Sequence, residues 1–374
     1  MSNKRILLVH EDRTLSNLFR EKLESSGFSV DSTRSLDQAP KLIATKNPDL
    51  IILDLVSNGG SPLGFIKDLR SEEATKALPV LVFPTSLTRL NNSAMQAGAT
   101  RIIPRTKQTL GSVIDSAKLA LGLRGLGDTA ETAIFQPDES WVEMVHQTAR
   151  ETLNQMRRCL PGLISEPPDL NTLNSLWATA HAFAERFALL DHKPLAQFAA
   201  AFDVLLAELF EFPEQLNSST IRTIGQSIDF LSTLSHPESL ATVNDTAKAR
   251  IVVVDDEESA REFITASMQL TQLPCECYET PTAALENLTG RRADLIFLDV
   301  SLPEMSGFDL CTKIRSLEEH EKTPIVFLTG MTNFHNKAQA SLSGGNDFVG
   351  KPFNLPEIGL KALMWLHRGQ LRLL

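Results

Sequence analysis

Short apolar runs alternate with amphipathic segments in the C-terminal third of the chain. The predicted strands are 251–254, 275–279, 295–298, 324–328 and 346–349. The predicted helices are 257–270, 281–290, 307–317, 333–342 and 355–370. Strict alternation of strands and helices is typical of a parallel sheet with helices on both faces. The pattern therefore predicts a doubly wound, five-stranded (βα)5 domain of the α/β class.

The N-terminal part of the chain repeats this pattern. Its strands are predicted near 5–9, 28–32, 49–53, 79–83 and 100–103. Three pairs of landmarks share an offset of 245 positions, namely Glu11 and Asp256, Asp54 and Asp299, and Pro79 and Pro324. An offset held over several landmarks indicates an internal repeat. We therefore expect two copies of one fold.

The middle of the chain shows helical periodicity only. Four segments carry it, at 141–163, 171–190, 195–210 and 218–234. In the second segment one apolar stripe comprises Leu173, Leu176, Ala180, Phe183, Phe187 and Leu190. Such a stripe at alternating spacings of three and four is typical of a bundle helix. Because proline-containing breaks separate the segments, we predict an antiparallel four-helix bundle, an all-α region.

These patterns divide the chain into three predicted domains. They are a first α/β domain in 1–124, the helical domain in 137–235 and a second α/β domain in 249–374, with linkers at 125–136 and 236–248. A net charge of −10 argues against nucleic acid or an anionic membrane as a partner. The four cysteines lack metal-ligand spacing, and no apolar run approaches a membrane span. We expect a cytoplasmic protein.

Acidic and polar residues follow the strands of the second copy. Asp255 and Asp256 come after its first strand, and Asp299 ends the apolar run of the third. Thr329 and Lys351 follow the fourth and fifth strands. In doubly wound sheets the ligand lies at the carboxyl ends of the strands, so these groups should share one crevice. Carboxylates suit Mg²⁺, and a carboxylate can also accept a phosphoryl group whose charge a metal, a lysine and a hydroxyl stabilise.

The second copy resembles the receiver domain of two-component response regulators over the whole of 249–370. The resemblance rests on D-V-S-L-P-E-M-S-G (299–307), F-L-T-G (327–330) and D-F-V-G-K-P-F (347–353). It implies that Asp299 is the phosphoacceptor and that Asp256, Asp299 and the Ser301 carbonyl bind Mg²⁺. It also implies that Asp255 holds a metal-bound water, that Lys351 pairs with the phosphoryl group, and that Thr329 and Phe348 form a switch pair.

Two other interpretations of the second copy are consistent with an aspartate at a strand end. One is a Rossmann-like core whose acids lie at strand ends by coincidence. The other is a phosphatase of the haloacid dehalogenase type, which also uses an aspartate nucleophile. That family requires a second acid two residues after the nucleophile, where this chain has Ser301. The sequence therefore favours the receiver.

The first copy departs from the receiver pattern at most of these positions. It keeps Asp54 and Glu11, but His10 replaces the first acid and Ile102 stands where the second copy has Phe348. Pro84 replaces the threonine and Arg105 replaces the lysine. Proline has no hydroxyl to donate, and arginine is not interchangeable with a lysine point charge. We therefore predict a pseudo-receiver that serves as a binding surface; the alternative is slow phosphorylation at Asp54.

His181, in the second helical segment, is the candidate phosphohistidine. It lies one position from the centre of the apolar stripe, which predicts partial exposure. The placement is similar to that in the histidine phosphotransfer domain, which has a lysine three residues on and a glycine four residues on. Here those positions are Ala184 and Glu185, and Arg186 offers partial compensation at most. We predict a degenerate spacer; the alternative is a working phosphorelay through His181.

Together these patterns predict a response regulator and not an enzyme. The phosphoryl donor would be a partner histidine kinase or phosphotransfer protein, and a downstream signalling protein would receive the output. The last helix is unusually apolar, with Trp365, Leu366, Leu371, Leu373 and Leu374. This excess suggests a homodimer contact, or a helix that continues into a fused output domain such as a nucleotide cyclase, in which case the chain would be the regulatory half of an enzyme.

Overall fold

A computed structural model gives the fold of the chain. It describes residues 4–56, 60–83, 85, 88–103, 109–123, 139–165, 167–190, 192–330 and 343–373. The chain forms two compact units. The first comprises Met1–Val145 and Asn174–Asp191, and the second comprises His146–Leu173 and His192–Leu374.

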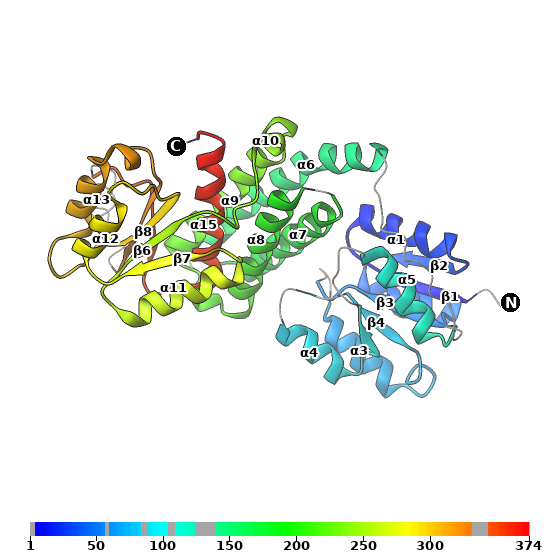
Figure 1. Cartoon of the computed structure of the whole chain (residues 1–374). Coiled ribbons are helices and arrows are strands. Elements are labelled where there is room, and N and C mark those ends of the chain that lie inside the picture. Colours follow the sequence, from blue (N-terminus) through cyan, green and yellow to red (C-terminus); the bar gives the residue numbers. More distant parts are fainter. Residues whose placement is uncertain are drawn as a thin grey trace. The chain divides into compact units, whose positions relative to one another are not determined.

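The first unit contains a parallel sheet in the order β2-β1-β3-β4-β5 (Figure 1). Its strands are β1 (Arg5–Val9), β2 (Ser29–Thr33), β3 (Leu50–Leu53), β4 (Val80–Val82) and β5 (Arg101–Ile102). The helices are α1 (Arg13–Ser25), α2 (Ala39–Lys46), α3 (Pro62–Ser71), α4 (Thr88–Ala97) and α5 (Thr109–Ala120). All four residues of β3 are buried, as expected for a central strand with both faces covered.

The second unit repeats this topology, with the parallel strand order β10-β9-β8-β6-β7. The strands are β6 (Ile251–Val254), β7 (Cys275–Tyr278), β8 (Leu295–Asp299), β9 (Ile325–Thr329) and β10 (Asp347–Gly350). The helices are α11 (Glu258–Leu270), α12 (Pro281–Leu288), α13 (Gly307–Arg315) and α15 (Leu355–Gln370). Helices α11 and α15 pack together, and α12 packs with α13. The two predicted five-stranded parallel sheets are therefore confirmed.

A helical region separates the two sheets in the sequence. It comprises α6 (Glu139–Ile164), α7 (Leu170–Ala188), α8 (Lys193–Glu211) and α9 (Ser218–Leu234), followed by the short α10 (Pro237–Thr242). The four predicted helical segments are thus helices. Asn217 caps α9, since its side chain accepts hydrogen bonds from the backbone N–H groups of Ser219 and Thr220. The predicted helix at 333–342 and the predicted linker at 125–136 lie outside the described residues.

Helix α15 is buried on every side from Pro356 to His367. It packs against α11 on one side and against α8 and α9 on another, all within the second unit. Trp365 and Leu366 are each 5% exposed. The apolar excess that suggested a homodimer contact is therefore largely covered by helices of the same chain. Leu371 is partly buried and Leu373 exposed, while Leu374 lies outside the described residues.

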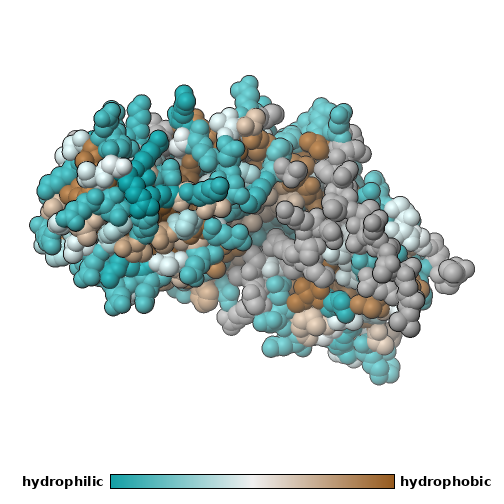
Figure 2. Space-filling model, in the orientation of Figure 1, coloured by the Kyte–Doolittle hydropathy of each residue, from teal (hydrophilic) through white to brown (hydrophobic). Residues whose placement is uncertain are grey.

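The drawn face of the second unit is mainly hydrophilic, with apolar side chains scattered over it (Figure 2). Among the described residues, no helix has both the length and the apolar character needed to cross a bilayer.

Candidate functional site

The site of the second unit forms at the carboxyl ends of four parallel strands. Asp299 ends β8, Thr329 ends β9, Asp255 directly follows β6, and Lys351 directly follows β10. The strand register pairs Val254 with Leu298 and Gly350 with Thr329, so these side chains come together although they are far apart in the sequence. Asp255, Asp299 and Thr329 are all buried. The predicted crevice is therefore present.

Three carboxylates in this crevice converge. Asp255, Asp256 and Asp299 each offer an oxygen atom, and these atoms lie within 4.8 Å of one another. Arg261 fixes the acidic pair, since its Nη1 donates to the backbone carbonyls of Asp255 at 2.8 Å and Asp256 at 2.9 Å. The backbone N–H of Glu257 donates to Asp255 Oδ1 at 3.0 Å. Oxygen ligands in such a cluster could hold a hard divalent cation.

Lys351 bridges two of the carboxylates. Its Nζ lies 3.0 Å from Asp255 Oδ2 and 3.3 Å from Asp299 Oδ1. Its backbone N–H donates to the Thr329 carbonyl at 2.7 Å, which fixes where β10 leads into the site. Burial lowers the pKa of Lys351, but Asp255 and Asp299 outweigh burial and the net shift is upward. Lys351 therefore stays charged.

The charge on the crevice acids is only partly compensated. Burial raises the pKa of Asp255, and this effect exceeds the opposing effect of Lys351. Burial also raises the pKa of Asp299, and the negative charge of Asp255 adds to the shift. Three carboxylates converge here around one lysine, so negative charge remains that Lys351 alone cannot neutralise. A divalent cation fits this excess of charge as well as the donor set.

Gly307 allows α13 to begin directly beside Asp299. Its N–H donates to the Val300 carbonyl at 2.9 Å, and a Cβ added here would lie 2.0 Å from the Asp299 carbonyl oxygen. Only glycine therefore fits without moving the backbone that carries Asp299. The glycine is visible in the D-V-S-L-P-E-M-S-G segment, but the sequence gives no sign of this close approach.

Phe348 lies on β10, buried, with its backbone in register with Phe327. The guanidinium carbon of Arg222, on α9, lies 3.4 Å from the centroid of the Phe348 ring. Arg222 Nη2 also donates to the Phe348 carbonyl at 3.1 Å. Sequence reasoning missed Arg222, because it belongs to the helical region and no local pattern links it to the crevice.

The corresponding crevice of the first unit holds a different set of groups. His10 Nε2 lies 3.5 Å from Glu185 Oε2, and His181 Nε2 lies 3.7 Å from Glu185 Oε1. Arg186 Nε lies 3.6 Å from Asp12 Oδ2. Glu185 of α7 therefore lies between two imidazoles, that of His10, which directly follows β1, and that of His181, on α7 itself.

The predicted partial exposure of His181 is wrong. Its side chain is 1% exposed. The helical stripe describes only the packing of α7 along its own axis. From Asn174 onward, α7 belongs to the same compact unit as the first sheet, and its Glu185 meets His10 of the crevice. The side of α7 that carries His181, which the apolar stripe predicts to be partly exposed, is therefore buried.

Asp54 is buried at the end of β3, where its Oδ1 accepts a hydrogen bond from the Val56 N–H at 2.9 Å. Burial raises its pKa to about 6, although His10 acts in the opposite direction. Burial lowers the pKa of His10, but Glu185, Asp54 and Asp12 outweigh burial and raise it. Glu11 is partly exposed, whereas Pro84 and Arg105 lie outside the described residues.

The segments that match known proteins coincide with the two sheet-containing parts of the chain. Residues 6–111 and 251–362, more than half of the chain, match the family model of the response regulator receiver domain. The chain is 30% identical over 121 residues to the phosphate regulon transcriptional regulatory protein PhoB of Rhizobium meliloti, which covers 32% of the chain and 53% of that relative. It is 34% identical over 124 residues to the DNA-binding response regulator MtrA of Mycobacterium tuberculosis, covering 33% of the chain and 53% of the relative.

The chain therefore spans about half the length of these relatives. Among solved structures, the chemotaxis response regulator CheY4 of Vibrio cholerae is 31% identical, with a TM-score of 0.30, over 32% of this chain and 98% of that one. The chain belongs to the response regulator receiver domain family and contains two such domains, separated in the sequence by a helical region.

Proposed function

We propose that this response regulator takes up a phosphoryl group on Asp299 and signals through protein contacts. The observation that carries the proposal is the convergence of Asp255, Asp256 and Asp299 with Lys351 at 3.3 Å from Asp299. A partner histidine kinase or phosphotransfer protein would supply the phosphoryl group. The activity would be limited to the chain's own phosphorylation and dephosphorylation.

The chemistry is a phosphoryl transfer to a carboxylate. An oxygen of Asp299 forms a bond to phosphorus, and the bond from phosphorus to the donor nitrogen of a phosphohistidine breaks, leaving the electron pair on the imidazole. With acetyl phosphate, the bond to the acetate oxygen breaks and acetate leaves. Lys351 neutralises charge on the phosphoryl oxygens, and the Thr329 hydroxyl holds one of them.

Mg²⁺ fits the acidic cluster. Asp256, Asp299 and the backbone carbonyl of Ser301 would hold it, with Asp255 acting through a bound water. When bound, Mg²⁺ would neutralise charge on the phosphoryl oxygens as they approach a crevice that already carries three carboxylates. Without such neutralisation, the buried acids would repel the incoming phosphoryl group.

The first receiver and the helical region would have binding roles. We propose that 1–124 is a pseudo-receiver and that 137–235 is a phosphotransfer-like helical domain, with the second receiver in 249–374. The support is the position of Glu185, which lies within 4 Å of both His10 and His181 and would repel a phosphoryl group there.

The proposal is tested by labelling the full chain with radioactive acetyl phosphate and Mg²⁺. We expect one hydroxylamine-sensitive phosphoryl group per chain, lost in Asp299→Asn and retained in Asp54→Asn. The two variants make the same chemical change at the ends of equivalent strands, so each controls for the other. Undiminished labelling of Asp299→Asn would show that Asp299 is not the acceptor.

A further inference from the structure

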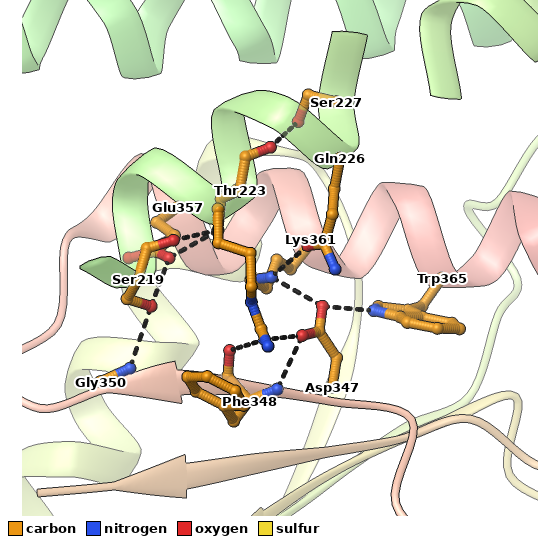
Figure 3. A network of polar contacts seen from close by, with 11 residues as sticks. Ser219, Thr223, Gln226, Ser227, Asp347, Phe348, Gly350, Glu357, Lys361 and Trp365 are labelled. Carbon is orange, nitrogen blue, oxygen red and sulfur yellow. Dashed lines mark hydrogen bonds and ion pairs between the residues drawn. The ribbon is translucent and has the colours of Figure 1, made fainter. Parts of the chain in front are cut away.

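Helix α9 reaches the second receiver through one polar face, which consists of Ser219, Arg222, Thr223 and Gln226. These positions are spaced by three, four and seven residues, so they lie on one side of the helix. We call them the α9 contact face. Its side chains bond to β10 and α15, and every contact lies within the second unit. Figure 3 labels three of these residues, Ser219, Thr223 and Gln226.

The contact face holds the far end of β10. Ser219 Oγ accepts a hydrogen bond from the Gly350 N–H at 3.2 Å and donates to Glu357 Oε1 at 2.8 Å. Thr223 Oγ1 donates to the same carboxylate oxygen at 2.7 Å. Glu357, on α15, is buried, and Ser219 and Thr223 are buried with it. Ser219 thus links α9 to both α15 and the last residue of β10.

The contact face also holds the near end of β10, through Asp347. This carboxylate pairs with Arg222 and accepts from Lys361 Nζ at 2.6 Å and Trp365 Nε1 at 3.1 Å. Burial raises the pKa of Asp347, but Lys361 and Arg222 outweigh burial and lower it, so it remains charged. Gln226 completes the network by accepting from Lys361 Nζ at 2.8 Å.

Charged groups buried in this way tolerate little displacement. The side chains of Lys361 and Asp347 are 0% and 1% exposed. If α9 moved away from β10, Asp347 would lose Arg222 and keep its charge in a site without solvent to replace it. The network therefore opposes displacement of β10 from α9.

Strand β10 connects this network to the phosphorylation site. It is four residues long, and α9 contacts its first two residues and its last. The next residue is Lys351, whose Nζ now pairs with both Asp255 and Asp299. A phosphoryl group on Asp299 would compete with Asp255 for Lys351, and would place its own oxygens where Lys351 now meets Asp299. Because Lys351 directly follows β10, an adjustment of Lys351 would act on the end of the strand that Ser219 holds through Gly350.

We propose that α9 reads the phosphorylation state of Asp299 through β10, with Arg222 and Ser219 as positioning residues. This inference rests on the proposed function. The contact face holds β10 in the arrangement of the unphosphorylated chain, and phosphorylation loosens that hold. Coupling of this kind is reciprocal, so loosening the contact face by mutation must favour the phosphorylated arrangement. The signal then reaches the helical region through packed elements of one unit.

The test measures the affinity of the Mg²⁺-loaded full chain for beryllofluoride, which mimics an aspartyl-phosphate. Arg222→Met removes the charge over Phe348 but keeps a long side chain, and Ser219→Ala removes the two hydrogen bonds to Gly350 and Glu357. We expect Arg222→Met to bind beryllofluoride at least about fivefold more tightly, the lower end of usual coupling. The control is Arg157→Met, since Arg157 pairs with Asp229 on α9 at 3.0 Å without contacting the receiver; its affinity should be unchanged.

A purely structural defect would weaken binding, so tighter binding separates coupling from damage. Hydrogen exchange of the wild-type chain gives a second measurement that needs no mutation: beryllofluoride should accelerate exchange at Gly350 and at the start of α9. If wild type binds beryllofluoride, then unchanged or weaker binding by Arg222→Met, or unchanged exchange, overturns this inference and leaves the proposed function standing. If wild type itself does not bind beryllofluoride, the proposed function fails and this inference fails with it.

Discussion

The two receivers place carboxylates at the same strand ends but stabilise them differently. In the second unit, Asp299 lies beside a charged lysine and within reach of two further acids. In the first unit, the nearest described charged neighbours of Asp54 include His10, His181 and Glu185, two of them from α7. The same scaffold thus supports two different sites. The site of the second unit is suited to a cation and a phosphoryl group, whereas burial of Asp54 in the first unit favours a protonated carboxyl. The chemistry is set by a few side chains at the strand ends and, in the first unit, also by side chains of α7.

The largest expected difference in stability between the two units concerns Gly307, the glycine beside Asp299. Gly307→Ala should destabilise the second unit by about 3–5 kcal/mol, because its Cβ would meet backbone atoms that cannot yield without moving Asp299. Gly64→Ala in α3 should cost less than about 1 kcal/mol, since its Cβ would meet only the Ser61 side chain at 3.2 Å.

Urea unfolding followed by tryptophan fluorescence would measure this difference. In a Trp141→Phe, Trp177→Phe background, Trp365 on α15 reports on the second unit alone. In a Trp365→Phe background, Trp141 and Trp177 report on the first unit, which holds Gly64. Equal effects of the two alanines on their own units would show that the close approach at Gly307 is not rigid.

The buried carboxylate of the first unit predicts a pH effect. The pKa of Asp54 is raised to about 6 in the folded chain, above its ordinary value of 3.8, so the stability it contributes at low pH is lost as the pH rises through about 6. Asp54→Asn should therefore stabilise the first unit at pH 7 relative to wild type, by up to about 2–3 kcal/mol, and should have little effect at pH 4.

Asp49→Asn is the matched control in the same unit. Lys4 lowers the pKa of Asp49, so its contribution is present above the unfolded pKa and is lost as the pH falls. The two variants should change the pH dependence of unfolding in opposite directions, with a smaller change for the part-exposed Asp49. A stabilisation by Asp54→Asn that does not vary with pH would contradict the assignment.

A smaller difference in free energy is expected when an acid of each crevice is neutralised and Mg²⁺ binding is measured. Asp256→Asn should weaken Mg²⁺ binding by the full chain about tenfold or more, about 1.4 kcal/mol, because it removes one of three converging carboxylates. Glu11→Gln, the equivalent change in the first copy, should have little effect. Isothermal titration calorimetry measures both, and a larger loss for Glu11→Gln would place the stronger metal site in the first receiver.

The smallest effect is expected at His181. Phosphorylated full chain should carry no alkali-stable phosphohistidine, since Glu185 lies 3.7 Å from the His181 ring and would oppose a phosphoryl group. His181→Gln should therefore leave the labelling of Asp299 unchanged. An alkali-stable signal that disappears in His181→Gln would instead identify the helical region as a working relay.

The sequence predicted the elements that depend on local pattern. Alternating runs predicted both sheets, and the order of strands brought Asp255, Asp299 and Lys351 together because carboxyl ends of parallel strands meet at one edge. Packing between distant segments could not be predicted in the same way. No local pattern links Ser219, Arg222 and Gln226 to the receiver, yet each bonds to it. The apolar excess of α15 likewise has its explanation in α8 and α9.

The strand order of the second sheet gives the α9 contact face another consequence. Strand β10 is the outermost strand, bonded to β9 on one side, so its other side would be an open sheet edge. Unpaired edges are templates for adding strands from other chains, which leads to aggregation. Here Ser219 Oγ accepts a hydrogen bond from the Gly350 N–H, and Arg222 Nη2 donates one to the Phe348 carbonyl. The helical region therefore protects the receiver against edge-to-edge association, and a receiver excised without α9 would lose that protection.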